Sequence, residues 1–166
     1  MYLKLNAQET EKLDSVAGSL GVAGDALYHL INFESSWDPS ALNDATGARG
    51  LIQFMPDTAR SLGFADAEDL YANNPDRLSQ LDLVYKYLRS YTPFPTDQSL
   101  AMAVFYPAYR NVSGDTLFPQ IVRDYNPGIN TPNDYLKKMY GPGWIPPAVI
   151  MAGLLITIFL LFRKGV

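Results

Sequence analysis

The first part of the chain places hydrophobic residues at the spacing of an amphipathic helix. Within residues 10–20, apolar side chains recur at i, i+3, i+4 and i+7, namely Leu13, Val16, Ala17 and Leu20. This spacing is typical of the buried face of an α-helix, and Gly21 is suited to end it. A second helix is predicted directly afterwards, with Gly24 and Asp25 as its caps.

The second predicted helix carries an acidic residue on its apolar face. The same i, i+3, i+4, i+7 stripe is formed by Leu27, Leu30, Ile31 and Glu34. A carboxyl group among apolar side chains tends to keep its proton near neutral pH, which is the property a general acid needs. The alternative is that Glu34 lies near the helix end and turns into solvent. Periodicity alone leaves both interpretations open.

The rest of the chain also predicts helices. A loop rich in turn formers follows Trp37, and four further helices are expected at Pro56 to Gly63, Asn74 to Tyr91, Thr96 to Pro107 and Thr131 to Tyr140. Thr96 and Thr131 are suitable N-caps, and prolines fit the first turns. No strand pattern and no internal repeat is visible. The predicted fold class is therefore mainly α, with one helical domain over residues 1–140.

The C-terminal part has a different character. Residues 145–162 form a run of 18 residues without a charge, which as a helix would be roughly 27 Å long and could cross a bilayer. A single transmembrane helix is predicted there, joined by a Gly/Pro linker at 141–144 and followed by a basic tail at 163–166. Two lysines precede the run and two basic residues follow it, so the positive-inside rule gives no orientation.

Composition excludes several kinds of chemistry. The chain has no cysteine and one histidine, His29, so neither a disulfide framework nor a thiolate or histidine metal site is expected, and no cofactor is implied. The predicted globular part carries 17 acidic against 11 basic residues. Nucleic acid is an improbable partner for so acidic a domain, because phosphate contacts need clustered Lys and Arg.

Two segments together resemble a known family. Residues 34–39 read ESSWDP and residues 47–56 read GARGLIQFMP; we call these the first and second motifs. They resemble the soluble lytic transglycosylases, whose pattern is Glu-Ser, then Asn-Pro, then Gly-Ala-x-Gly-Leu-Met-Gln-x-Met-Pro. Asp38 stands where the family commonly has Asn, Ile52 where it has Met, and the loop between the motifs is about one residue longer. The resemblance implies a lysozyme-like fold.

A third family motif is present in altered form. The family has Ala-Tyr-Asn before a glycine, whereas residues 103–108 read AVFYPA, so that Tyr106 takes the place of the tyrosine and Pro107 that of the asparagine. This Phe-Tyr-Pro version, with the later residues 126–130 and 134–135, is similar to a variant in phage and phage-like members. The alternative for Tyr106 is an ordinary core aromatic.

The resemblance implies residue roles and a reaction. Glu34 would be the catalytic acid and base, with Tyr106 orienting it, and the substrate would be peptidoglycan. Cleavage between N-acetylmuramic acid and N-acetylglucosamine would close a 1,6-anhydro ring, so no second carboxylate is required. The residues expected to bind substrate are Ser35, Trp37, Asn43, Gln53 and Met55. The loop residue that supports Glu34 is either Asn43 or Asp44, and Arg49 is expected in solvent.

Alternatives to a transglycosylase remain at this point. Asp38 or Asp44 could serve as a second carboxylate in a hydrolytic lysozyme, although a solvated turn aspartate explains both. A non-catalytic structural protein of a viral membrane or capsid could also have kept the fold.

The expected location follows from the apolar run. The N-terminus shows no secretory signal, so we expect a single-pass protein in a phage virion membrane that opens the cell wall during genome delivery. Its partners there would be lipid, peptidoglycan strands and other virion proteins. The alternative is a bacterial inner-membrane protein facing the periplasm.

Overall fold

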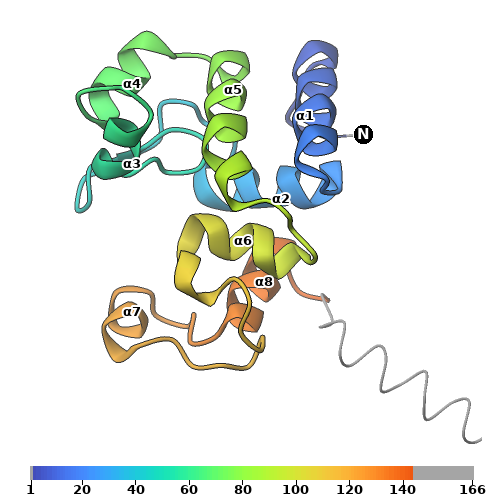
Figure 1. The fold of residues 1–166 in the computed structure, drawn as a ribbon, viewed down its shortest axis with the longest axis vertical. Coiled ribbons are helices and arrows are strands. Elements are labelled where there is room, and N and C mark those ends of the chain that lie inside the picture. The colour runs from blue at the N-terminus through green and yellow to red at the C-terminus, as the bar shows by residue number, and fades with distance from the viewer. Residues whose placement is uncertain (1, 144–166) are drawn as a thin grey trace, which may run out of the picture. The chain divides into compact units, whose positions relative to one another are not determined.

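The protein is described by a computed structural model that covers residues 2–143. The described residues divide into two compact units, 2–113 and 114–143 (Figure 1). In the described part no helix is both long enough and apolar enough to cross a membrane. The predicted membrane helix at 145–162 and the tail at 163–166 lie outside the described residues.

Helix α1, Ala7–Leu20, begins three residues earlier than the hydrophobic pattern indicates. The reason is a capping box, in which Asn6 and Glu9 each accept a hydrogen bond from the other's backbone N–H at 2.9 Å. The helix ends at Gly21, whose φ of 71° is left-handed, as predicted. The predicted apolar face is confirmed as buried.

Helix α2, Gly24–Ser35, carries the stripe predicted from the sequence. Leu27, Leu30 and Ile31 are fully buried, whereas Glu34, one turn further on, is half-buried. The prediction that Gly24 and Asp25 cap this helix is wrong. Ala23 is the N-cap and provides no side-chain bond, so both predicted caps lie inside the first turn.

The remaining helices of the first unit follow the predicted order, with one addition. The elements are α3 (Pro56–Ser61), α4 (Ala67–Asn73), α5 (Arg77–Leu88), η1 (Arg89–Tyr91), α6 (Asp97–Phe105) and η2 (Pro107–Tyr109). Helix α5 begins at Arg77 because Asp76 is its cap, and Thr96 caps α6 as predicted. The sequence did not reveal α4, a short helix capped by Asp66. The mainly helical fold class is confirmed.

A small hairpin interrupts the helices and corrects the expectation that the chain has no strands. Strands β1 (Leu42–Asn43) and β2 (Ala48–Arg49) pair antiparallel between the two motifs. Asn43 accepts hydrogen bonds from the N–H groups of Ala45 and Thr46 at 3.1 and 3.3 Å, which builds the turn. Two-residue strands are too short to produce an alternating pattern.

The helices of the first unit pack so that α2 is enclosed. Helix α1 contacts both α2 and α5, and α6 contacts α2 and α5 (Figure 1). The large side chains that are fully buried in this unit include Trp37, Phe54, Leu13, Leu27, Leu30, Ile31, Leu51, Leu70, Leu81 and Leu88. The stripe of α2 therefore belongs to the core that holds the first motif in place.

The second unit contains two helices in its described part. They are α7, Gln120–Tyr125, and α8, Pro132–Tyr140. Thr131 caps α8 through a capping box with Asp134, as its Thr-Pro start predicted, whereas α7 has no side-chain cap and was missed. Asn133 links α8 to the start of this unit. Its backbone N–H donates to the Gly114 carbonyl at 2.9 Å, and its side-chain Nδ2 donates to Asp115 at 2.8 Å.

Leu30→Ala tests the importance of the α2 stripe. Because Leu30 is fully buried, its truncation should lower the free energy of unfolding by about 2–5 kcal/mol. The matched control is Leu3→Ala, since Leu3 is 95% exposed and its loss should cost less than about 0.5 kcal/mol. Urea unfolding of both variants checks this, and equal costs would contradict the packing described.

Candidate functional site

Glu34 lies at the point where α2 leaves the core. The helix ends one residue later, and Ser36 follows as its C-cap with a φ of 56°. The Ser36 N–H donates to the Asn32 carbonyl at 2.9 Å, which closes the last turn. Glu34 is thus held by a helix whose other stripe residues are fully buried, and is itself half-buried.

Backbone strain is concentrated in the two motifs. Among the described residues, three that are not glycine have positive φ angles: Ser36 at 56°, Trp37 at 67° and Gln53 at 53°. Each such residue costs on the order of 1–3 kcal/mol, and persists only where the surroundings hold it. All three lie within residues 34–56. Strain of this kind clusters at functional sites, which makes this segment the candidate site.

Ser35 joins the two motifs. Its buried hydroxyl lies 2.9 Å from the Leu51 carbonyl and 3.2 Å from the Ile31 carbonyl, so it ties the end of α2 to the second motif. The prediction that Ser35 binds substrate is therefore corrected. The Ser35 hydroxyl is hydrogen-bonded inside the protein. These bonds fix the backbone directly after Glu34.

Gln80 of α5 is a residue that the sequence did not single out. Its side chain is fully buried. Its Oε1 accepts a hydrogen bond from Leu51 N–H at 2.9 Å, and its Nε2 donates to the carbonyls of Pro39 at 2.8 Å and Asn74 at 2.9 Å. One amide thus holds the end of the first motif against the second. The only hint in the sequence is Gly50, which leaves room for this close approach.

Gln53 and Met55 are the two residues of the second motif that the resemblance places in the sugar-binding groove. Gln53 donates from Nε2 to the carbonyls of Ala41 and Gly50 at 3.3 and 3.2 Å, and Met55 is 45% exposed. Both line a cavity of about 30 Å³ that also includes Tyr87. Their contact with substrate stays a prediction.

The hydroxyl of Tyr87 is a fixed donor behind that cavity. It donates to the Ala103 carbonyl at 2.8 Å, which links α5 to α6. Burial, together with the neighbouring Tyr91, raises the pKa of Tyr87. The Tyr87 hydroxyl at the cavity wall is therefore engaged within the protein.

Trp37 is a core residue, and its predicted place in a substrate groove is wrong. The indole is fully buried and stacks on Tyr28 with the ring centroids 5.4 Å apart. Trp37 also has a positive φ of 67°. Phe54, a second aromatic in the motifs, is also buried.

Asp38 is explained by a turn. Its Oδ1 accepts hydrogen bonds from the Ser40 hydroxyl at 2.7 Å and the Ser40 N–H at 2.8 Å. These two bonds, with a smaller contribution from the charge of Arg77, hold the pKa of Asp38 below its usual value. The family's asparagine could accept the same bonds, so the substitution preserves the turn.

Arg49 is not in solvent, which corrects the expectation for it. It forms an ion pair with Glu68, and its guanidinium lies 4.1 Å from the centre of the Tyr71 ring. Both partners belong to α4, the helix that the sequence did not reveal. Arg49 thus holds the hairpin against α4.

Tyr106 follows the last residue of α6 and belongs to the same compact unit as Glu34. Pro107 begins the short helix η2, which brings the Tyr106 and Tyr109 rings to 5.1 Å. Tyr106 is half-buried. Its catalytic role stays a prediction, as do the roles of Asn43 and Asp44, both of which are exposed on the hairpin.

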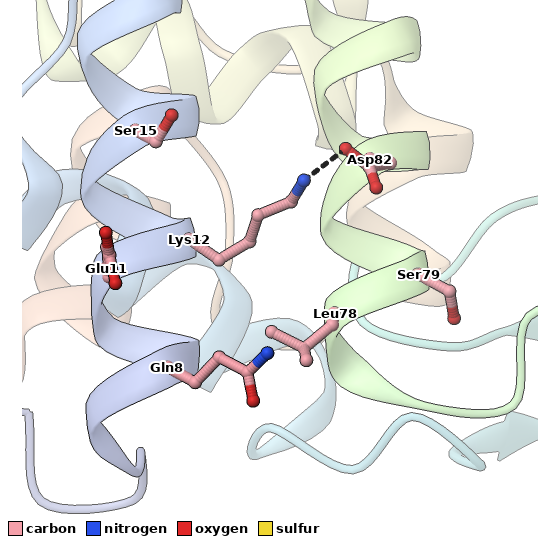
Figure 2. A pocket seen from close by; sticks show the side chains of 7 residues that line it. All are labelled: Gln8, Glu11, Lys12, Ser15, Leu78, Ser79 and Asp82. Atoms are coloured by element: carbon pink, nitrogen blue, oxygen red, sulfur yellow. Dashed lines mark hydrogen bonds and ion pairs between the residues drawn. The ribbon is translucent and has the colours of Figure 1, made fainter.

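An open groove of about 370 Å³ lies away from the motifs, between α1 and α5 (Figure 2). Lys12 and Asp82 form an ion pair of 2.5 Å across it. In residues 2–143, no group of three or more His, Cys, Asp or Glu side chains could hold a metal ion. The motifs therefore remain the candidate site.

The comparison with known families agrees with this geometry. Residues 15–102, just over half of the chain, match the family described as Transglycosylase SLT domain. The chain belongs to this family. The matched segment contains both motifs, Glu34 included, and ends before Tyr106. No curated protein and no solved structure is significantly similar to the chain.

Gly50→Ala tests the close contact between α5 and the second motif. A Cβ at Gly50, where φ is +82°, would lie 2.5 Å from Gln80 Oε1, and that oxygen cannot move without losing its bond to Leu51. We expect a loss of about 1–3 kcal/mol beyond that of Gly63→Ala. Gly63 has a φ of +99° but open space around it, so it isolates the backbone effect. Chemical unfolding measures both, and equal losses would refute the contact.

Proposed function

We propose that this protein is a peptidoglycan lytic transglycosylase that uses Glu34 as its catalytic acid and base. The observation that carries the proposal is the half-buried Glu34 at the end of α2, two residues before Ser36 and Trp37, which are held in strained conformations. Membership of the transglycosylase SLT domain family supports the same reaction and implies peptidoglycan as the substrate.

The proposed reaction needs one carboxyl group. Glu34 donates its proton to the oxygen between N-acetylmuramic acid and N-acetylglucosamine, and the bond from that oxygen to the muramyl C1 breaks. The carboxylate then takes the proton of the muramyl 6-hydroxyl, whose oxygen bonds to C1 and closes a 1,6-anhydro ring. No water is consumed, and Glu34 ends protonated as it began. Acid-base help of this kind is typically worth 10²–10⁴-fold.

A hydrolytic lysozyme is the second candidate, and the surroundings of Asp38 weigh against it. Most hydrolases use a second carboxylate that holds water or attacks the sugar. The Oδ1 of Asp38 is bound to Ser40 on both its backbone and side chain. A structural role explains this aspartate, so it supplies no argument for a hydrolase.

A non-catalytic structural protein is the third candidate. Strained residues lower stability, and a protein that only needed the fold would gain by relaxing them. Ser36 and Trp37, close to Glu34 in the sequence, and Gln53 in the second motif nevertheless have left-handed conformations. Strained residues in the same two motifs as an acidic residue favour an enzyme over a purely structural protein.

The membrane location is proposed from the sequence of residues 145–162, which contains no charge. We place the enzyme on a phage virion membrane, because the Phe-Tyr-Pro version of the third motif resembles phage members; other virion proteins and lipid would be its partners there. Proteomics of purified virions, before and after their lipid is removed, tests this location. The protein should be found in intact virions and should be lost with the lipid. Recovery of the protein from bacterial inner membranes instead would support the alternative location.

Glu34→Gln decides among the three candidate functions. The amide cannot exchange the proton, so release of products from peptidoglycan should fall about 10²–10⁴-fold, while the midpoint of thermal unfolding stays close to that of the unaltered protein. Mass spectrometry of the digest identifies the reaction. Anhydromuropeptides from the unaltered protein support the transglycosylase, reducing muramyl ends the hydrolase, and no products from either protein the structural role.

Asp38→Asn separates the turn from a catalytic carboxylate. The amide oxygen can accept the same two bonds from Ser40, so we expect activity within about threefold of the unaltered enzyme, whereas Asp38→Ala should lose roughly 1 kcal/mol of stability with the turn. The assay is product release at neutral pH. An inactive but folded Asp38→Asn would point to the hydrolase.

A further inference from the structure

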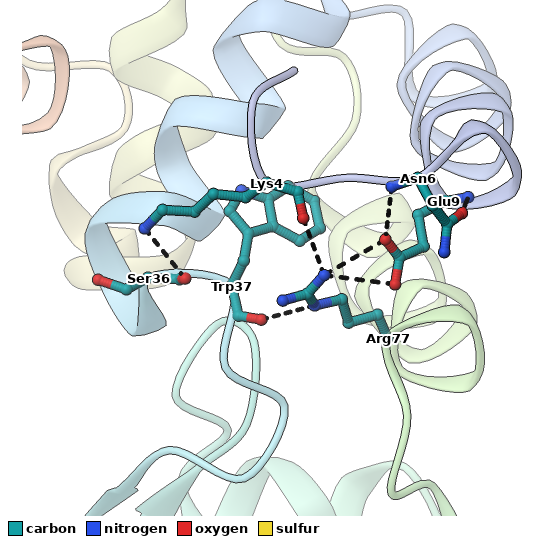
Figure 3. A network of polar contacts seen from close by, with 6 residues as sticks. All are labelled: Lys4, Asn6, Glu9, Ser36, Trp37 and Arg77. Atoms are coloured by element: carbon teal, nitrogen blue, oxygen red, sulfur yellow. Dashed lines mark hydrogen bonds and ion pairs between the residues drawn. The ribbon is translucent and has the colours of Figure 1, made fainter.

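A network of polar contacts joins the N-terminal segment, the turn after Glu34 and the start of α5 (Figure 3). Arg77, the first residue of α5, donates from Nε to the Trp37 carbonyl at 2.8 Å. The Nη1 of Arg77 donates to the Lys4 carbonyl at 2.9 Å. The same nitrogen lies 3.3 and 3.4 Å from the two Glu9 carboxylate oxygens. One guanidinium therefore holds three separate segments.

The neighbouring carbonyl in the turn is also bound by a cation. Lys4 donates from Nζ to the carbonyl of Ser36 at 3.2 Å (Figure 3). Both left-handed residues, Ser36 and Trp37, thus have their carbonyls bound by positive charges. Helix α2 has no basic residue in its last turn, and its negative end gains from cations placed there. These cations come from elsewhere in the fold.

The network is partly shielded from water. The Arg77 and Glu9 side chains are only 28% and 14% exposed, so their attraction is weakened less by solvent than that of a surface pair. Glu9 also accepts from the Asn6 N–H within the capping box of α1. The start of α1 therefore fixes Glu9, Glu9 orients Arg77, and Arg77 fixes the turn.

Aromatic stacking holds the same segment from the other side. Tyr2 stacks on Tyr28 at 4.7 Å between ring centroids, and Tyr28 stacks on Trp37. The Tyr2 hydroxyl donates to Asp14 at 3.0 Å, and burial followed by this bond raises the pKa of Tyr2 to about 12. The N-terminal segment is therefore anchored over the turn that it helps to hold.

We infer that Arg77 is a positioning residue for Glu34: by holding the Trp37 carbonyl it maintains the left-handed turn that fixes the direction of the glutamate at the end of α2. Lys4 assists through Ser36, and Glu9 orients the guanidinium. The inference rests on the proposed catalytic function of Glu34. Arg77, Lys4 and Glu9 all lie outside the two motifs, and none of the three needs to touch the glycan.

Arg77→Met in the full-length protein, held in detergent micelles, is the test. The apolar chain fills similar space without donors, so the turn should loosen. We expect kcat on peptidoglycan to fall roughly 10-fold to 100-fold while KM changes less than about twofold, since misplacement of a catalytic group by about 1 Å costs this much. Arg77→Lys keeps the charge but cannot bind the Trp37 and Lys4 carbonyls with two separate nitrogens. Its kcat should therefore lie between those of Arg77→Met and the unaltered protein.

Two controls separate positioning from general loss of stability. Lys12→Met removes another cation between α1 and α5, the one that ends on Asp82 away from the turn (Figure 2). Val16→Ala creates a small defect in the buried face of α1. Each variant is assayed at the same interval below its own unfolding midpoint. Unchanged kcat in both controls supports the inference. A fall in kcat in Val16→Ala as large as that in Arg77→Met overturns it.

A measurement that does not depend on activity keeps the two proposals distinguishable. The chain contains four glutamates, so the ¹³C carboxyl signals of glutamate-labelled protein can be resolved and Glu34 assigned with Glu34→Gln. Arg77→Met should move the Glu34 signal, and Lys12→Met should not. A moved signal in a protein that releases no products would overturn the proposed function alone. An unmoved signal would overturn the positioning role whether or not the enzyme is active.

Discussion

The structure around Glu34 depends on holding two consecutive non-glycine residues, Ser36 and Trp37, in the left-handed conformation. Without help the backbone would relax, because each costs on the order of 1–3 kcal/mol. Their neighbours supply that help. The Trp37 ring is buried against Tyr28, and its carbonyl accepts a bond from Arg77. The packing of the Trp37 ring and the hydrogen bond from Arg77 together stabilise a backbone conformation that is unfavourable by itself.

Helix α5 connects this turn to the second motif. Arg77 and Gln80 are three residues apart, so they lie on the same side of the helix. The first binds the turn after Glu34, and the second binds both Pro39 and Leu51. A shift of α5 would therefore move both motifs together. The site is a unit whose parts are far apart in the sequence but are held by one turn of one helix.

The sequence predicted what periodicity and short-range capping determine. The stripe of α2, the end of α1 at Gly21 and the cap at Thr96 follow from local residues alone. It did not predict α4, which has only seven residues, of which Ala67 and Leu70 are buried, and which is held by Arg49 from the hairpin. It also assigned Trp37 to the groove, because a positive φ at a tryptophan has no signature in the sequence. Gln80 was missed because a buried amide looks like any polar helical residue until its partners are known.

A single carboxyl group can complete the proposed reaction only if it keeps its place between two proton transfers. Glu34 must first face the glycosidic oxygen, which leaves with N-acetylglucosamine, and then the 6-hydroxyl of the muramyl residue. A glutamate on a loose helix end would lose this geometry between the steps. The fully buried residues of α2 fix the helix below Glu34, and the bound turn fixes the chain beyond it. The strain next to Glu34 is thus consistent with a reaction that relies on position in place of a second carboxylate.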